Sequence, residues 1–258
     1  MAHENPIILV IGGGWHVPAS YKKLVDALEA AGFEVHCPPL PSMTQERPPT
    51  KSLAEDTESI RTYAEKLIDA NGGRRVVAVM HSYGGQVGTN GLVGLGLKNR
   101  AEQGLSGGVS DLVYLCAFAL PEGGSMAGKV KDMGHEALIP IAFDFADDMS
   151  CLCRDPRGQL VGSGVDEDEL EDYLATLLRW NGQAMYDDIS QCAWREIPVT
   201  YVYAANDMTV PMDYQMSMVA LLEEQGQAVK KHELQTGHCP NLTAVNDVVE
   251  VINSVVGV

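Results

Sequence analysis

Short apolar runs alternate with amphipathic helical patterns along most of this chain, and the alternation limits the folds it can adopt. The first run covers residues 7–11 and ends in three glycines, and residues 21–28 follow with apolar side chains at the i, i+3, i+4 and i+7 spacing of a helix. This order is typical of a parallel sheet with helices on both faces. We therefore predict an α/β fold with a mainly parallel six-stranded sheet flanked by helices.

The apolar runs and the segments between them give the expected positions of the elements. The predicted strands cover residues 7–11, 33–37, 75–80, 112–118, 197–204 and 229–234. The predicted helices cover residues 21–28, a segment opened by a capping box at residues 52–55, and residues 83–97, 211–225 and 240–256.

Residues 121–196 interrupt the alternation, because they contain helix-like patches and turns but no clear strand. An insertion between the fourth and fifth strands lies over the carboxyl ends of the strands, where open α/β sheets bind ligands. We predict a core made of residues 1–120 and 197–258, with residues 121–196 as a helical cap.

The charge of the chain argues against several classes of partner. Its 258 residues include 18 basic and 35 acidic side chains, for a net charge of −17. Such a surface repels phosphate backbones and anionic lipids, so we expect neither nucleic acid nor membrane as a partner. Much of the acid lies in residues 166–172, which we interpret as the first turn of an exposed helix; the alternative is a cation or partner site.

The N-terminus and the cysteines indicate a cytoplasmic protein. Residues 1–6 carry no basic patch ahead of the first apolar run, so a secretory signal is not expected. No second cysteine or histidine pair stands at ligand spacing from Cys151 and Cys153. We therefore predict no metal site and no cofactor. We expect reduced thiols at all six cysteines: Cys37, Cys116, Cys151, Cys153, Cys192 and Cys239.

The third predicted strand leads directly into a serine followed by glycines. Ser82 lies between the apolar residues 76–80 and a predicted helix that begins at Tyr83. Such a tight turn pushes the serine hydroxyl out above the sheet, next to the first backbone N–H groups of the helix. Ser82 is therefore our candidate nucleophile; the alternative is a turn serine without chemistry.

A serine hydroxyl is a weak nucleophile at neutral pH, so it needs a base and a group that orients the base. Asp207 follows the fifth predicted strand and His238 follows the sixth. The order Ser, Asp, His at three separate strand ends is that of a catalytic triad in this architecture. Either residue alone has a simple structural explanation, but the three together predict a triad.

An acyl-transfer site also needs two N–H donors aimed at the negative charge of the transition state. We predict one at Tyr83, directly after the nucleophile, and the other in the glycine loop after the first strand, at Gly14 with Trp15 next. A nucleotide-binding loop is the alternative for this loop. It requires a glycine where Val17 stands and an acid near Cys37, so we reject it.

The substrate-binding residues are less clearly specified. Large or polar side chains near the predicted strand ends and in the cap are candidates for the wall of the site. We name His16, Phe118, Phe143, Phe145, Trp180, Met185, Tyr186, Trp194 and Met208. His81, beside the nucleophile, is expected to pack or hydrogen-bond behind the turn.

Over almost its whole length the chain resembles the α/β-hydrolase superfamily, and more narrowly the methylesterase and hydroxynitrile lyase-like group with its fungal relatives. The group's His-Gly-x-x-His pattern after the first strand is matched at Gly13 and His16, with Gly12 in place of the first histidine. In the Gly-x-Ser-x-Gly motif around Ser82, Met80 replaces the first glycine, so small neighbours such as Gly84, Gly85 and Gly88 must make room for it.

The resemblance implies Ser82 as nucleophile, His238 as base and Asp207 as the residue that orients the base. Cyanohydrin lyases of the group carry a lysine directly after the catalytic histidine, where this chain has Cys239. Members that displace halide use an aspartate as nucleophile, which Ser82 replaces.

Three hypotheses of function follow. The first is a serine hydrolase that acts through an acyl-enzyme on a small or medium apolar ester, lactone or thioester. The second is a lyase or a polyketide cyclase-like enzyme that uses the same Ser82 and His238 as acid–base groups. The third is a ligand receptor on this fold. A small-molecule substrate is the expected partner, and the oligomeric state stays open, with a homodimer as one option.

Overall fold

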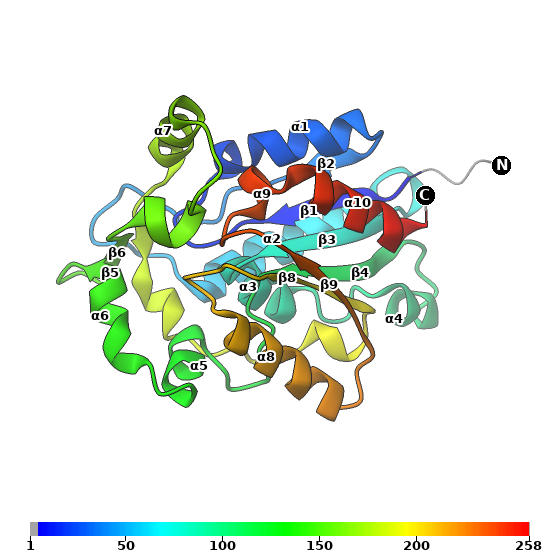
Figure 1. Ribbon diagram of the computed structural model, residues 1–258. Coiled ribbons are helices and arrows are strands. Elements are labelled where there is room, and N and C mark those ends of the chain that lie inside the picture. The colour runs from blue at the N-terminus through cyan, green and yellow to red at the C-terminus, as the bar shows by residue number, and fades with distance from the viewer. Residues whose placement is uncertain (1–4, 258) are drawn as a thin grey trace.

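A six-stranded parallel sheet forms the centre of the molecule (Figure 1). The computed structural model describes residues 5–257; the first four residues, considered above for a secretory signal, lie outside the described residues. The strands run in the order β2-β1-β3-β4-β8-β9. Their bounds are Ile7–Ile11 (β1), Glu34–His36 (β2), Arg75–His81 (β3), Gly108–Leu115 (β4), Val199–Ala204 (β8) and Val229–Leu234 (β9).

Helices cover both faces of this sheet, as its central strands require. All five residues of β1 are buried, and so are the last six residues of β3, so neither face of these strands meets water. Helices α1 and α10 cover one face, while α2, α3 and α8 lie on the other (Figure 1). The helices of the core are α1 (Lys22–Ala30), α2 (Leu53–Asp69), α3 (Tyr83–Gly91), α4 (Leu97–Glu102), α8 (Met212–Glu224), α9 (Pro240–Thr243) and α10 (Val245–Val256), with short 3-10 helices η1 (Pro18–Tyr21) and η2 (Ala70–Gly72).

The 121–196 segment differs from the prediction. It contains a three-stranded antiparallel sheet in the order β5-β6-β7, where we expected helices and turns but no clear strand. These strands have two to four residues, so their alternation of side chains is too short to be recognised in a sequence. The segment holds α5 (Met126–Asp132), η3 (Glu136–Leu138), α6 (Ile139–Ala142), β5 (Phe143–Phe145), β6 (Ser150–Cys153), η4 (Pro156–Val161), α7 (Glu167–Thr176), β7 (Trp180–Asn181), η5 (Gly182–Met185) and η6 (Ala193–Arg195).

Two of the predicted helices are interrupted. The helix predicted over 83–97 stops at Gly91, and a separate helix begins at Leu97, because the glycines between them allow a turn; Gly94 has φ of +79°. The helix predicted over 240–256 is broken at Ala244, which leaves helical geometry with ψ of 39°. These differences leave the order of strands and helices in the core unchanged.

Candidate active site

Ser82 occupies the turn between β3 and α3 in a conformation that few non-glycine residues adopt, with φ of 53° and ψ of −121°. Glycines make this turn possible. A side chain at Gly84 would lie 2.2 Å from the Ile11 carbonyl oxygen, and one at Gly88 would lie 2.3 Å from the Met80 sulfur. The room that Met80 needs is therefore provided by Gly88, whereas Gly84 allows α3 to approach the backbone of β1.

Three side chains from separate strand ends meet at this turn. His238 Nε2 lies 2.9 Å from Ser82 Oγ, and His238 Nδ1 lies 2.7 Å from Asp207 Oδ2. All three residues are buried, at 5% exposure or less. With the Nδ1 proton donated to the carboxylate, Nε2 is free to accept the proton of the Ser82 hydroxyl, which is the arrangement that nucleophilic catalysis requires.

Asp207 is itself held by its own loop. Its second oxygen, Oδ1, accepts hydrogen bonds from the backbone N–H groups of Thr209 and Val210, both at 2.7 Å. These bonds fix the carboxylate so that Oδ2 faces His238. The loop before α8 was expected to provide an acid at this place, and it does so with a defined orientation.

His81 lies behind the turn, as expected, and extends the hydrogen bonding to the glycine loop. The Gly13 N–H donates to the Tyr21 hydroxyl (2.8 Å), and that hydroxyl lies 2.7 Å from His81 Nδ1. His81 Nε2 lies 2.7 Å from the His238 carbonyl oxygen, to which it donates. Burial lowers the pKa of His81 well below its usual value, so this histidine is neutral. We name Tyr21, His81 and His238 the histidine network.

His16, a predicted wall residue, takes part instead in holding the glycine loop. Its Nδ1 lies 2.7 Å from the Gly14 carbonyl oxygen, and its Nε2 lies 2.8 Å from the Tyr173 hydroxyl. Burial lowers the pKa of His16 to about 3, so the ring is neutral and donates from Nδ1. Cys239 packs beside it, and burial raises the pKa of this thiol to about 12.

The backbone around His16 orients the predicted oxyanion donors. The His16 N–H donates to the Gly13 carbonyl, and the His16 ring donates to the Gly14 carbonyl. In a trans peptide the N–H points opposite to the carbonyl, so the N–H groups of Gly14 and Trp15 point away from His16. Trp15 reaches this geometry with φ of 67°. Tyr83 stands at the first position of α3, directly after Ser82.

Aromatic side chains cover the glycine loop. The Trp180 ring packs so closely on Gly14 that a side chain there would lie 2.9 Å from it, and it crosses Trp15 edge-on with centroids 5.3 Å apart. Phe143 stacks on Trp15 at 5.2 Å. Phe118 is buried, and its N–H donates to the Ser82 carbonyl. Of the predicted wall residues, Phe118 thus contacts Ser82 through its backbone, while Trp180 and Phe143 pack on the glycine loop.

The other predicted wall residues are placed differently. Met208 is 72% exposed and Tyr186 is 42% exposed, with Phe145 packed against Tyr186. Trp194 is buried and donates to the Leu120 carbonyl, below the guanidinium of Arg195. Met185 is buried in η5. For these residues the structure gives no contact with the three candidate catalytic side chains.

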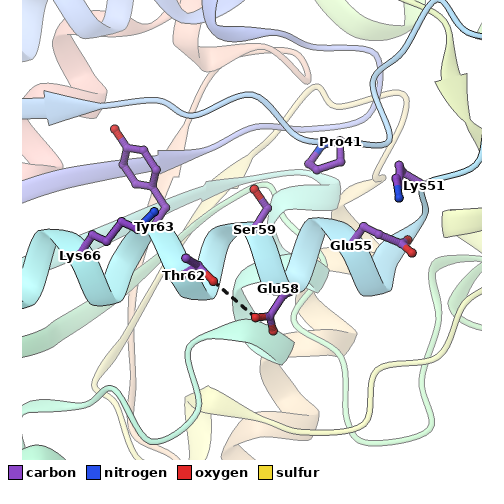
Figure 2. A pocket seen from close by; sticks show the side chains of 8 residues that line it. All are labelled: Pro41, Lys51, Glu55, Glu58, Ser59, Thr62, Tyr63 and Lys66. Carbon is purple, nitrogen blue, oxygen red and sulfur yellow. Dashed lines mark hydrogen bonds between the residues drawn. The ribbon is translucent and has the colours of Figure 1, made fainter.

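Two other features of the described residues, a cluster of histidines with a cysteine and a surface groove, do not form a candidate active site. The ligand atoms of His81, Cys116 and His238 lie within 4.8 Å of one another, but both nitrogens of each histidine already take part in hydrogen bonds, so a metal ion does not fit. A shallow groove of about 460 Å³ lies on α2 and includes Lys51, Glu55 and Lys66 (Figure 2). Its lining residues contain none of the three candidate catalytic side chains.

Sequence reasoning missed a buried acid on the inner side of α2. Asp56 is fully buried and accepts hydrogen bonds from Ser42 and from the Tyr83 hydroxyl. The available signal was its spacing: Asp56 follows the buried Leu53 by three residues and precedes the buried Ile60 by four, so it occupies an inward position of the helix. Among residues 5–257, no helix is both long and apolar enough to cross a membrane.

Comparison with known proteins agrees with this architecture. A model of the alpha/beta hydrolase family matches residues 8–251. The alpha/beta hydrolase nvfD of Aspergillus novofumigatus is 30% identical over 255 residues, which cover 98% of this chain and 97% of that protein. A probable hydrolase of Phoma sp. is 27% identical over 259 residues, covering 98% and 99% of the two chains.

Solved structures share the fold at lower identity. Polyneuridine aldehyde esterase superposes with a TM-score of 0.73 at 16% identity, covering 97% of this chain and 99% of that one. A pyrethroid hydrolase from Sphingobium faniae gives a TM-score of 0.70 at 18% identity, covering 98% and 97%. The match of the family model over nearly the whole chain shows that the protein belongs to the alpha/beta hydrolase family.

Proposed function

We propose that this protein is a serine hydrolase that cleaves a small or medium apolar ester, lactone or thioester. The observation that carries the proposal is the hydrogen-bonded series from Ser82 Oγ through His238 to Asp207, at 2.9 and 2.7 Å. The fold neighbours named as an esterase and as a pyrethroid hydrolase support hydrolysis as the type of reaction.

In the proposed reaction, Ser82 Oγ forms a bond to the substrate carbonyl carbon while its proton moves to His238 Nε2. The carbonyl oxygen becomes negative and accepts hydrogen bonds from the N–H groups of Tyr83 and Gly14. The bond to the leaving group then breaks, and the leaving oxygen or sulfur takes the proton from His238. Water then attacks the acyl-enzyme while its proton moves to His238 Nε2. The bond to Ser82 Oγ breaks, Oγ takes the proton back from His238, and the acid is released.

The surroundings of Ser82 support an apolar substrate. Trp15 stacks on Phe143 and meets Trp180 edge-on, so the side chains packed around the glycine loop are apolar. The two nearest histidines outside the triad, His16 and His81, are neutral. Neither ring provides a positive charge that would select a charged acyl group.

A burst experiment with a chromogenic ester tests the proposal. We expect rapid release of one equivalent of alcohol or phenol, followed by slower turnover, and we expect Ser82→Ala to abolish both. Ser110→Ala is a matched control, because Ser110 is also buried but its hydroxyl bonds to the Val76 carbonyl on the far part of β3. Full ester turnover by Ser82→Ala would exclude the proposed mechanism.

The lyase or cyclase alternative has less support. Cys239, at the position where lyases of the related group carry lysine, is a neutral buried thiol and cannot replace an ammonium group. If the protein formed no adduct with an organophosphonate and turned over no ester in a broad panel, that result would favour this alternative or the receptor hypothesis over hydrolysis.

A further inference from the structure

Asp56 is a buried acid that the proposed triad does not use. It lies on the inner side of α2 and is fully shielded from solvent. Its carboxylate accepts hydrogen bonds from the Ser42 backbone N–H (2.8 Å), the Ser42 hydroxyl, and the Tyr83 hydroxyl (2.8 Å). Three donors therefore converge on two oxygens, which is how a buried carboxylate is usually satisfied.

These donors connect Asp56 to the residue that follows the candidate nucleophile. Tyr83 begins α3, and its backbone N–H is one of the two predicted oxyanion donors. The hydroxyl end of the Tyr83 side chain is fixed by Asp56, and its ring lies 4.8 Å from the ring of Trp180. The side chain is thus held at both its polar end and its apolar face, which restrains the start of the helix.

The same carboxylate also reaches the second predicted donor, by way of Ser42. The Ser42 hydroxyl, which donates to Asp56, accepts a hydrogen bond from Trp180 Nε1 at 3.1 Å. The Ser42 carbonyl accepts from the Asn181 N–H, which fixes β7 at this place. Trp180 in turn presses on Gly14 and lies against Trp15. We name Asp56, Ser42, Tyr83 and Trp180 the carboxylate network.

We propose that Asp56 is a positioning residue that acts through Tyr83 and Trp180 to hold the backbone donors of the oxyanion hole on both sides of Ser82. The inference rests on the proposed function, since it concerns the transition state of acyl transfer. An asparagine at position 56 would turn an N–H₂ group toward the two hydroxyls, so that both hydroxyl protons would lose their acceptor. A buried donor without a partner is costly, and the network would rearrange.

The experiment compares Asp56→Asn and Tyr83→Phe with a matched control. Tyr114→Phe removes another buried tyrosine hydroxyl, which also bonds to α3 (Thr89, 2.6 Å) but is not connected to Asp56. We expect Asp56→Asn and Tyr83→Phe each to lower kcat by about 10- to 100-fold with KM changed less than about threefold, because the oxyanion forms only in the transition state. Tyr114→Phe should leave kcat unchanged.

Two further measurements separate positioning from a general loss of structure. A trifluoromethyl ketone that forms a tetrahedral adduct at Ser82 should bind each network variant more weakly by about the same factor as kcat/KM falls, while the affinity for the product acid stays the same. The double variant of Asp56 and Tyr83 should lose less than the product of the two single losses, because both act by one route.

The outcomes distinguish this inference from the function on which it rests. If ester turnover by the wild type does not depend on Ser82, the proposed function fails and the inference fails with it. If turnover depends on Ser82 but Tyr83→Phe and Asp56→Asn behave like Tyr114→Phe, only the role of Asp56 is overturned. Should Asp56→Asn not fold, Tyr83→Phe decides alone, because it keeps the carboxylate and removes a single hydroxyl.

Discussion

Two buried networks support the two sides of Ser82, and they differ in charge. The histidine network joins the neutral side chains of Tyr21 and His81 to the backbone carbonyl of His238. The carboxylate network is organised around an acid at Asp56. The ring of His81 lies 4.9 Å from that of His238, where the mechanism requires a positive imidazolium to form. A second positive ring there would oppose it, so a neutral support suits the base.

The carboxylate network has a different proposed task, because its Tyr83 and Trp180 side chains hold the segments that carry the predicted oxyanion donors. A carboxylate accepts several hydrogen bonds at once and binds each more strongly than a neutral acceptor does. We infer that the histidine network leaves His238 able to gain and lose a proton. The carboxylate network instead keeps the predicted oxyanion donors in position. The following predictions test this distinction.

The largest effect is expected for Asp207→Asn. The amide presents either a donor or a weaker acceptor to His238 Nδ1, so the ring loses the carboxylate that fixes its orientation and stabilises the imidazolium. We expect kcat for ester cleavage to fall by about 10⁴-fold. Single-turnover acylation kinetics measure the loss at the chemical step.

Thr209→Ala provides the control for this variant. The Thr209 side chain bonds to the Gln159 carbonyl, and only its backbone N–H contacts Asp207. Its kcat should therefore remain close to that of the wild type. A loss in Asp207→Asn no greater than that in Thr209→Ala would contradict the role of Asp207.

Tyr21→Phe tests the histidine network and should act mainly on stability. The change removes the hydroxyl that joins the Gly13 N–H to His81 Nδ1, leaving both buried groups without a partner. We expect the free energy of unfolding to fall by about 1–3 kcal/mol. Urea unfolding monitored by tryptophan fluorescence measures it. A larger loss in kcat than Asp56→Asn shows would reverse the proposed division between the networks.

The sequence predicted the core well because its signals are local. Strand patterns, most of them apolar runs, and the helix spacing between them located all six strands of the main sheet along the chain. The three candidate catalytic residues were found because each follows a strand, and the carboxyl ends of parallel strands meet at one edge. The structure brings Ser82, Asp207 and His238 within hydrogen-bond distance there.

The networks behind the site could not be predicted in the same way. Ser42 and Trp180 are 138 residues apart in the chain, and His16 and Tyr173 are 157 residues apart, so neither pair leaves a local pattern. The position of His16 in the motif likewise gives no sign that its ring bonds to Tyr173. The strands β5, β6 and β7 were missed because each is too short for a periodic signal.

The pH dependence of stability should distinguish two buried groups with opposite pKa shifts, His16 beside the glycine loop and Asp56 of the carboxylate network. His16 has a folded pKa of about 3 against 6.5 in the reference state, so its contribution to stability is present above pH 6.5 and is lost as the pH falls toward 3. Asp56 has a folded pKa of about 6 against 3.8, so its contribution is present below pH 3.8 and is lost as the pH rises through 6. Between pH 4 and 6 the two slopes oppose each other.

Removing Asp56 and removing His16 should therefore change the slope of unfolding free energy against pH in opposite directions. We expect Asp56→Asn to steepen the fall in unfolding free energy between pH 6 and 4 by about 1.4 kcal/mol per pH unit, and His16→Gln to make it shallower by a similar amount. Urea unfolding at several pH values in this window measures both. Parallel curves for the two variants and the wild type would contradict the opposing signs.

The smallest effect is expected where charges are numerous but exposed, in the acidic residues 166–172. Arg157 pairs there with Glu167 and Glu171, and these side chains are 45%, 69% and 61% exposed. Exposed ion pairs contribute little because water and salt screen them. Arg157→Ala should leave both the urea midpoint and kcat/KM within experimental error of the wild type, at low and at high salt.

Asp166 caps α7 by accepting from the Asp168 N–H, so the acids already have a structural role at the start of that helix. A change in kcat/KM in Arg157→Ala would instead favour the partner-site interpretation of this acidic run, and would show that buried networks are not the only part of the chain that supports the site.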